Sequence, residues 1–487
     1  MIGSRRFRAI AAIVGVLTLT VVGQAVPAGA APQARQALAV LPSGPVPYGY
    51  GSNTDGELGN GTKTDSPSPT PVTGLPGTVR QLATGLRSSA ALLTDGSLWT
   101  WGNDYYGQLG YDCTRCDETT PHQVPGLTGV VQFALSVEGN GYAVESDGSV
   151  WAWGDNHLAQ LGNGSTTPSD TPVRVPILTG ITQVAAGVYY ALARQSNGTV
   201  WAWGDNSEGN LGDGTTYNES LPEPVNHLSG ITQIASGGLT SYAVRSDGTL
   251  FAWGNNQDGV LGNGTTSTFS ATPAPVPGLA SVTQVASNSS ATLAVTGASG
   301  SLWAWGDNSC GELGDGTTAN KLSPEPIGLT GVTQVTMGAR FLLNSNSAAV
   351  RSDGSLYTWG CNGFGVLGYP NTGNVTTPTR VTALAKVSQF AFGDDSTGIT
   401  RLGAFALAVG IVPVTVPNLH GDTTAQAGAA LNAVGLFFGS VTYSVDLTCE
   451  NIGEVIRQSP AAGSQVNRGS AVSVTFATAP RPPRECP

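Results

Sequence analysis

Short runs of alternating apolar and polar residues recur along most of the chain, and glycine separates them. Residues 181–187 (ITQVAAG) alternate until their glycine, and residues 190–194 (YALAR) form a second run. Residues 199–203 (TVWAW) are apolar on both faces, which requires cover from both sides. A fourth, shorter run lies near residues 222–225. Such alternation is typical of strands, so the pattern predicts a four-stranded sheet built from consecutive strands.

A loop of the form Trp-Gly-x-Asn-x-x-Gly-x-Leu-Gly follows the third predicted strand, and the chain contains seven versions of it. Successive copies lie 50 to 54 residues apart, and each begins with an aromatic residue: Tyr50, Trp101, Trp153, Trp203, Trp253, Trp305 and Trp359. Dipeptides such as Asn197-Gly198 precede the third strands and accept the positive φ of a tight hairpin. This period and composition predict one propeller blade per repeat and not a helical solenoid.

The two ends of the repeat series are incomplete in complementary ways. The last predicted first strand, near Val387, leads to residues 405–409 (FALAV), but no Trp-Gly loop follows it. The first such loop, at Tyr50, has no first or second strand before it. We therefore expect residues 46–75 to complete a seventh blade with residues 387–410, which leaves no exposed sheet edge. The predicted fold class is all-β, a seven-bladed β-propeller closed by pairing its N- and C-terminal strands.

Residues 1–30 have the composition of a secretory signal peptide. Arginines at positions 5, 6 and 8 precede an apolar run of 14 residues, and Ala28-Gly29-Ala30 places small residues where a signal peptidase cleaves. The run is shorter than the roughly 20 residues that a membrane-spanning helix needs. We predict an exported protein without membrane association after cleavage, with a linker at 31–45 and the propeller at 46–410.

Six cysteines, an even number, fit an oxidising compartment. They allow fifteen pairings, among which the sequence alone does not choose. We favour local pairs: Cys113 with Cys116, Cys310 with Cys361, and Cys449 with Cys486. Cys310 and Cys361 lie at nearby points of the same loop in neighbouring repeats. The Cys-Thr-Arg-Cys spacing also fits half of a zinc site, but no second such pair or histidine pair accompanies it.

The chain is acidic and shows no recognisable catalytic arrangement. Only 11% of its 487 residues are charged, and the formal net charge is −11. This charge argues against nucleic-acid binding, which depends on positive surfaces. The four histidines occupy non-equivalent positions in the chain, so a serine–histidine–aspartate arrangement is not predicted. The recurring Asp-Asn pairs lack the alternating oxygen ligands of calcium loops. We predict no metal, no cofactor and no enzymatic activity.

The repeat resembles a known family. Residues 203–215 (WGDNSEGNLGDGT) and their six relatives are similar to the regulator of chromosome condensation repeat, over about residues 46–410. The resemblance implies a seven-bladed propeller. The family's founder exchanges nucleotide on a small nuclear GTPase and docks on chromatin, but the inserted hairpin that such exchange uses has no counterpart here. The segment 187–192 (GVYYAL) is closer to a secreted bacterial member, the type II beta-lactamase inhibitory protein, which clamps an enzyme with one propeller face.

A second resemblance covers residues 411–478. The segments 416–421 (VPNLHG), 453–460 (GEVIRQSP) and 462–470 (AGSQVNRGS) are similar to the PASTA domain. That resemblance implies a small α+β domain, with one helix on a sheet, which occurs in penicillin-binding proteins and cell-wall-sensing kinases. It implies association with the cell wall through peptidoglycan, or a role as a spacer. A Pro-rich tail follows at 479–487.

The helix of that second domain has its own signal in the sequence. Thr423 and Gln426 have the spacing of a capping box, in which each side chain bonds to the backbone of the other residue. Residues 427–436 have helical periodicity, and Gly435 marks its end. We expect the helix to lie within these limits.

Variation among the repeats is concentrated in two sets of loops. In antiparallel blades, the loop between the first and second strands lies on the same face as the Trp-Gly loop, and we call this the variable face. Exposed aromatic and arginine side chains dominate protein interfaces. The predicted binding residues on this face are Arg87, Tyr105, Tyr106, Tyr189, Tyr190, Arg340, Phe341 and Phe364.

These patterns predict an exported, monomeric and non-enzymatic binding scaffold. Its variable face would bind a secreted or surface protein or a cell-wall component such as peptidoglycan, and the PASTA domain would associate with the wall. Two alternatives stay open: a propeller enzyme acting on cell-wall glycan or peptide, and a guanine-nucleotide exchange regulator. The enzyme would need acidic groups or histidines at the axis of the ring, and the exchange regulator would need a cytoplasmic location.

Overall fold

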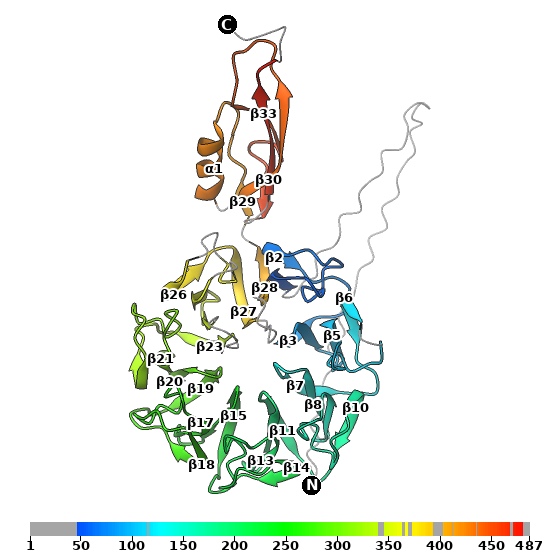
Figure 1. Ribbon diagram of the computed structural model, residues 1–487, viewed down its shortest axis with the longest axis vertical. Helices are drawn as coiled ribbons and strands as arrows, with labels where there is room; N and C mark the ends of the chain where they lie inside the picture. Colours follow the sequence, from blue (N-terminus) through cyan, green and yellow to red (C-terminus); the bar gives the residue numbers. More distant parts are fainter. Residues whose placement is uncertain are drawn as a thin grey trace, which may run out of the picture. The chain divides into compact units, whose positions relative to one another are not determined.

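Seven four-stranded sheets form the blades of a ring, and a smaller sheet with a helix follows them in the chain (Figure 1). The computed structural model describes residues 46–480 except 114–115, 339–344, 363–365, 369–372, 393–402, 412, 435 and 468–470. Neighbouring strands within each blade are antiparallel. We number the blades 1 to 7 in chain order from the sheet that begins at residue 79. The predicted all-β, seven-bladed fold is confirmed.

Each blade contributes one strand to each of four concentric positions. The first, innermost strands of blades 1 to 7 are β3 (Val79–Gly85), β7 (Val130–Leu135), β11 (Ile181–Ala186), β15 (Ile231–Gly237), β19 (Val282–Ser287), β23 (Val332–Met337) and β27 (Leu384–Phe392). The second strands are β4 (Ser88–Leu93), β8 (Asn140–Glu145), β12 (Tyr190–Gln195), β16 (Thr240–Arg245), β20 (Ala291–Thr296), β24 (Asn346–Arg351) and β28 (Gly403–Ile411). The third are β5 (Leu98–Asn103), β9 (Val150–Gly154), β13 (Val200–Gly204), β17 (Leu250–Asn255), β21 (Ser301–Gly306), β25 (Leu356–Gly360) and β1 (Val46–Gly51). The outermost are β6 (Asp117–Gln123), β10 (Ser169–Val175), β14 (Glu219–Pro224), β18 (Phe269–Pro275), β22 (Lys321–Pro326), β26 (Val375–Val381) and β2 (Ser66–Pro71).

Blade 7 is assembled from both ends of the propeller. Its strand order is β2-β1-β28-β27, so strands from the start of the domain complete a sheet that its end begins. β1 pairs with β28 over six residues, from Val46 opposite Ala408 to Gly51 opposite Gly403. This pairing confirms the predicted closure. β27 begins at Leu384, three residues before the predicted start, because Leu384 is buried in the blade core and pairs with Ile411.

Glutamine side chains on innermost strands join neighbouring blades at the axis of the ring. Gln132 in blade 2 accepts a hydrogen bond from the backbone N–H of Val184 (2.8 Å) and donates one to its carbonyl (3.1 Å). The same arrangement closes the ring: Gln389 in blade 7 accepts from the N–H of Leu82 (3.1 Å) and donates to the carbonyl of Arg80 (3.1 Å). Such paired bonds satisfy inward-facing backbone groups that no further strand reaches.

The tryptophans of the repeat lie between blades. Trp203 is 0% exposed, and its indole N–H donates to the carbonyl of Gln160 in the Trp-Gly loop of the preceding blade (2.8 Å). Leu211, from the Trp-Gly loop of blade 3, is buried in the core that also contains Trp253. Gly162 has a φ of +64°, and a Cβ there would lie 2.6 Å from the Trp203 ring, so the motif requires glycine at this point. The repeated residues therefore hold blades together.

The C-terminal unit is a small α+β domain. Its sheet has the order β30-β33-β31, and β29 pairs with β32 beside it. The elements are β29 (Pro413–Thr415), α1 (Thr424–Ala433), β30 (Phe437–Val445), β31 (Val455–Ser459), β32 (Gln465–Asn467) and β33 (Ala471–Thr478). The capping box of Thr423 and Gln426 is present, and the helix begins directly after Thr423, earlier than its apolar periodicity indicated. Among the described residues, no helix is long and apolar enough to cross a membrane.

Two of the three predicted disulfides are present. Cys113 is bonded to Cys116, and Cys310 in blade 5 is bonded to Cys361 in blade 6. Cys449 is also disulfide-bonded, and its predicted partner Cys486 lies outside the described residues. The Cys310–Cys361 bond ties two neighbouring Trp-Gly loops together. The proposed signal peptide and linker also lie outside the described residues.

Candidate binding face

The variable face is formed where two kinds of loop meet. The side chain of Gln108, in the Trp-Gly loop of blade 1, donates to the carbonyl of Leu86, in the first loop of the same blade (3.3 Å). Tyr106, in that Trp-Gly loop, also lies against Gly139 of blade 2, where an added Cβ would be 3.1 Å from the tyrosine Cβ. Loops from neighbouring blades are therefore contiguous on this face.

Two adjacent tyrosines stand out from this face. Tyr105 and Tyr106 are 54% and 46% exposed, and their rings meet edge to face with centroids 4.9 Å apart. The loop holds them in place, because the Tyr105 N–H donates to Asn103 Oδ1 (3.0 Å) and the Tyr106 N–H donates to Gln108 Oε1 (2.8 Å). Preorganised, exposed aromatic rings are the kind of group that anchors a partner.

The other predicted binding residues divide into three groups. Arg87 and Tyr189 are half-buried on the face, and Arg87 forms an ion pair with Asp55 (3.3 Å). Tyr190 is fully buried, and its hydroxyl donates to the carbonyl of Thr240 in the next blade (2.9 Å). Its prediction as a surface residue was wrong, because β12 already begins there and the side chain packs between blades. The remaining three, Arg340, Phe341 and Phe364, lie outside the described residues.

Two carboxyl groups of blade 2, those of Glu138 and Asp155, lie near Tyr189 of blade 3. Burial, together with the charge of the neighbouring Asp155 carboxylate, raises the pKa of Glu138 to about 7. Burial also raises the pKa of Tyr189, with a contribution from the charge of Glu138. Asp155 is paired with the exposed His157. The sequence did not single out Glu138, because no local pattern records its proximity to Asp155, which follows β9 in the same blade. The face therefore combines aromatic rings with negative charge.

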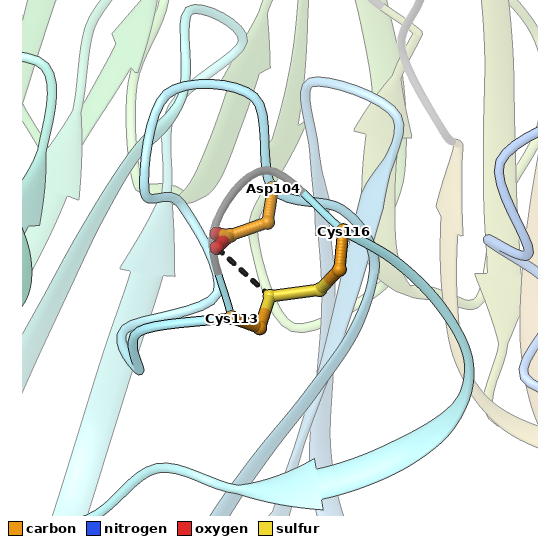
Figure 2. A group of neighbouring side chains, drawn as sticks. All are labelled: Asp104, Cys113 and Cys116. Carbon is orange, nitrogen blue, oxygen red and sulfur yellow. Dashed lines mark hydrogen bonds between the residues drawn. A yellow bond between two sulfur atoms is a disulfide. The ribbon is translucent and has the colours of Figure 1, made fainter.

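Asp104 forms a second cluster beneath the tyrosine loop, with the Cys113–Cys116 disulfide (Figure 2). It is 2% exposed; its Oδ1 accepts from the Leu109 N–H (2.8 Å), and its Oδ2 lies 3.2 Å from Cys113 Sγ. Burial raises the pKa of Asp104 to about 7. The three ligand-type atoms lie within 4.8 Å of one another, but the two sulfurs are bonded to each other and offer no thiolate to a metal. The sequence contained one signal for this site, an aspartate where the repeat has asparagine.

A cavity of about 280 Å³ lies at the innermost strands. Small and polar side chains such as Ser236, Ser287 and Gln334 contribute to its wall. None of the described residues that line it is an acid, a histidine, a lysine or a cysteine. These described walls offer serine and threonine hydroxyls but no acid–base group to activate them.

The C-terminal domain exposes apolar side chains of its own. Val441, Tyr443 and Val445 alternate along β30 and are exposed, and Leu447 continues the series. Large exposed apolar groups in a row mark interaction surfaces more often than isolated ones do. This row is called the β30 stripe below.

The buried carboxyl of Glu312 leads to a prediction about stability. Glu312 lies in the Trp-Gly loop of blade 5, is inaccessible to solvent, and accepts from the Cys310 N–H (2.8 Å). Burial raises its pKa to about 7, so folded protein binds the proton more tightly than unfolded protein does. Stability is therefore expected to fall as pH rises from about 4.5 to 7. Blade 2 has Gln160 at this position, with the same acceptor role toward Leu158 (2.8 Å).

The substitution Glu312→Gln is expected to raise the free energy of unfolding by about 1–3 kcal/mol at pH 8 and to leave it unchanged at pH 4. Urea unfolding at the two pH values measures the difference. Gln160→Glu is the matched control and is expected to introduce the opposite effect at pH 8. An equal increase in the free energy of unfolding at both pH values would contradict the raised pKa of Glu312.

The ring of blades with interlocked loops defines a repeat propeller. The sequence profile described as RCC1-like domain matches residues 36–344, and that of the regulator of chromosome condensation (RCC1) repeat matches residues 332–366 and 353–399. The chain belongs to the RCC1-like family. It also carries a PASTA domain, whose profile matches residues 414–478.

Curated relatives match only part of the propeller. The human E3 ubiquitin-protein ligase HERC2 is 35% identical over 165 residues, which is 33% of this chain and 3% of the ligase. The ultraviolet-B receptor UVR8 of Arabidopsis thaliana is 32% identical over 165 residues, 33% of this chain and 37% of the receptor. The chain thus spans well under half of either relative, and these relatives include a ligase as well as a receptor.

Solved structures agree on the fold. Prp20p of Saccharomyces cerevisiae aligns with a TM-score of 0.66 and 22% identity, over 76% of this chain and 93% of that one. Human WBSCR16 aligns with a TM-score of 0.65 and 23% identity, over 75% of this chain and all of that one (100%). At these identities the likeness establishes the propeller alone.

Proposed function

We propose that this chain is an exported, non-enzymatic binding scaffold. Its variable face binds a secreted or surface protein, or a cell-wall component, and its PASTA domain associates with the cell wall. The observation that carries the proposal is the exposed, preorganised pair Tyr105 and Tyr106 on a rigid propeller loop. Rigid aromatic groups lose little conformational entropy on binding, and this favours affinity.

Three further observations support this function over its alternatives. The described walls of the central cavity lack titratable groups, which disfavours an enzyme acting on wall glycan or peptide. The match to a PASTA domain favours a cell-wall setting over the cytoplasmic one that nucleotide exchange requires. The β30 stripe offers the C-terminal domain a contact surface of its own.

The binding proposal is tested by capture with the full mature chain. Wild type and Tyr105→Ala/Tyr106→Ala are immobilised and exposed to culture medium and cell-wall extract of the producing organism. The double variant is expected to retain the identified partner at least about tenfold less, because two central aromatic side chains each contribute on the order of 1–2 kcal/mol. Tyr443→Ser, at an equally exposed tyrosine of the other domain, is the matched control and keeps capture at the wild-type level.

Cosedimentation with purified peptidoglycan tests the wall association. Tyr443→Ser is expected to reduce the sedimented fraction, and the Tyr105/Tyr106 variant is expected to leave it unchanged. Unchanged partner capture by the Tyr105/Tyr106 variant would refute the variable face as the binding surface. Wild-type protein that stays in the supernatant would show that the PASTA domain is a spacer.

A further inference from the structure

In the part of the chain that the structure describes, five blades contain the same hydrogen-bonded pair in their Trp-Gly loops. An asparagine side chain donates to the backbone carbonyl and hydroxyl of a serine or threonine nine residues later. In blade 3, for example, Asn206 Nδ2 lies 3.2 Å from Thr215 O and 3.3 Å from Thr215 Oγ1. The pairs are Asn53–Thr62, Asn156–Ser165, Asn206–Thr215, Asn256–Thr265 and Asn308–Thr317. These pairs hold the loop in shape.

Blade 1 replaces both members of this pair. Asp104 stands at the asparagine position, and Cys113 stands nine residues later. Asp104 keeps one interaction of the asparagine, since its Oδ1 accepts from the Leu109 N–H (2.8 Å), as Asn206 accepts from Leu211 (2.9 Å). Its Oδ2 faces the cysteine sulfur at 3.2 Å in place of a hydroxyl (Figure 2). The loop architecture is preserved while an acid is placed beside a sulfur.

A proton on Asp104 fits this geometry. A sulfur in a disulfide carries no hydrogen, so a hydrogen bond between the two groups needs the proton on the carboxyl. Burial, with a smaller contribution from the charges of Asp170, Asp112 and Glu118, raises the pKa of Asp104 to about 7. Tyr111, the remaining titratable neighbour, is itself influenced by Asp104. At neutral pH and below, a proton is therefore available at this sulfur.

We propose that the Cys113–Cys116 disulfide is redox-active and oxidises dithiols, with Asp104 supplying the proton to Cys113. Both cysteines are half-buried, so an incoming thiolate can reach them, whereas Cys310 and Cys361 are buried. The Cys-x-x-Cys spacing is that of redox-active pairs, in which the two thiols of the reduced form stay next to each other.

The exchange proceeds in two steps. A thiolate of the dithiol attacks Cys116 Sγ; a bond forms between them, the Cys113–Cys116 bond breaks, and Cys113 leaves with the electron pair and takes the Asp104 proton. The second thiolate of the dithiol then attacks its own sulfur in the mixed disulfide and releases Cys116 as a thiolate, which is protonated from water. Two electrons have passed to this chain, the dithiol has become a disulfide, and Asp104 regains a proton from water.

Reduction by dithiothreitol across pH 5.5–9 tests this activity, with rates followed by quenching, alkylation and mass spectrometry of the cysteine peptides. Each second-order rate constant is divided by the thiolate fraction of dithiothreitol. For the wild type, this normalised constant is expected to fall about tenfold as pH rises through about 7, where Asp104 loses its proton. For Asp104→Asn it is expected to be low and independent of pH, because an amide cannot transfer the proton.

The repeat supplies controls for folding and for charge. Asp104→Asn introduces the residue that the six other blades have at this position, and thermal unfolding verifies that the propeller is retained. Asp112→Asn removes a neighbouring carboxylate. In this variant the normalised rate constant is still expected to fall near neutral pH. The Cys310–Cys361 disulfide, measured in the same samples, is expected to be reduced at least tenfold more slowly. Parallel pH profiles for wild type and Asp104→Asn, or equal rates for the two disulfides, would overturn the proposal.

Discussion

A chain that begins at residue 76 is expected to lose its cooperative unfolding transition, whereas one that begins at residue 31 is expected to keep it. The deletion removes β1 and β2, which form half of blade 7. β28 then becomes an unpaired edge along six residues that β1 otherwise covers. The deletion also removes Tyr50, which is fully buried in the blade 7 core near Phe390.

The loss would extend beyond blade 7. The indole of Trp101 in blade 1 donates to the carbonyl of Glu57, which lies in the deleted segment (2.8 Å). Buried donors without acceptors and an opened ring together remove far more than the stability margin of about 5–15 kcal/mol typical of a domain. Calorimetry and near-ultraviolet circular dichroism on the two chains measure the effect.

A peptide of residues 46–75 provides the control for ring closure. Added to the shortened chain, it is expected to restore part of the transition, because it supplies the missing strands in the register from Val46 to Gly51. A peptide of the same composition in scrambled order is expected to have no effect. If the shortened chain unfolds with the same midpoint and enthalpy as the longer chain, the two-ended blade does not hold the ring closed.

The repeating part of the fold was predictable because each repeat contains the sequence signals for its own strands and turns. Alternation gives the strands, Asx-Gly dipeptides give the hairpins, and an aromatic residue every 50 to 54 residues gives the blade period. Counting strands at the two ends then predicted blade 7, which the β1–β28 pairing confirms. Even the Cys310–Cys361 bond was predicted, because the two cysteines lie at nearby points of the same loop in neighbouring repeats.

The candidate sites were less predictable, since they depend on contacts between blades. The strand start at residue 190 was predicted correctly, but Tyr190 was also assigned to the variable face, whereas its side chain is buried between two blades. Glu138 acquires its raised pKa from burial and from Asp155 of the following Trp-Gly loop, and no local pattern records that proximity. Asp104 differs from the asparagine of the other repeats only in having an oxygen in place of the amide nitrogen. Its proposed role depends on the disulfide beside it.

Departures from the repeat therefore carry more functional information than the repeat does. Each Trp-Gly loop has the same scaffold duties, and blade 1 adds to them the exposed Tyr105 and Tyr106 and the pair of Asp104 with Cys113. The Asp104 N–H donates to the carbonyl of Cys116 (2.9 Å), so the disulfide and the tyrosines share one short loop. Binding at the face and exchange at the disulfide are consequently tested on separate residues of that loop.

Trp203→Ala is expected to lower the free energy of unfolding by about 3–5 kcal/mol, the cost of deleting a fully buried aromatic side chain. The indole fills the space beside Leu161 and Val184 in the core shared by blades 2 and 3. It also donates to the carbonyl of Gln160 (2.8 Å), which the substitution would leave with the Tyr142 hydroxyl (2.9 Å) as its donor. Gly162 lies against this ring and has no side chain with which to fill the cavity.

Trp201→Ala is the matched control, because Trp201 lies two residues earlier on β13 and is only half-buried. Its loss is expected to cost about 1–2 kcal/mol, in proportion to the smaller apolar area that it buries. Urea unfolding of both variants and of Trp203→Phe separates the two contributions of Trp203. The phenylalanine keeps most of the ring but not the hydrogen bond, so its cost should lie between those of wild type and Trp203→Ala. Equal losses at positions 201 and 203 would mean that the recurring tryptophan does not anchor one blade to the next.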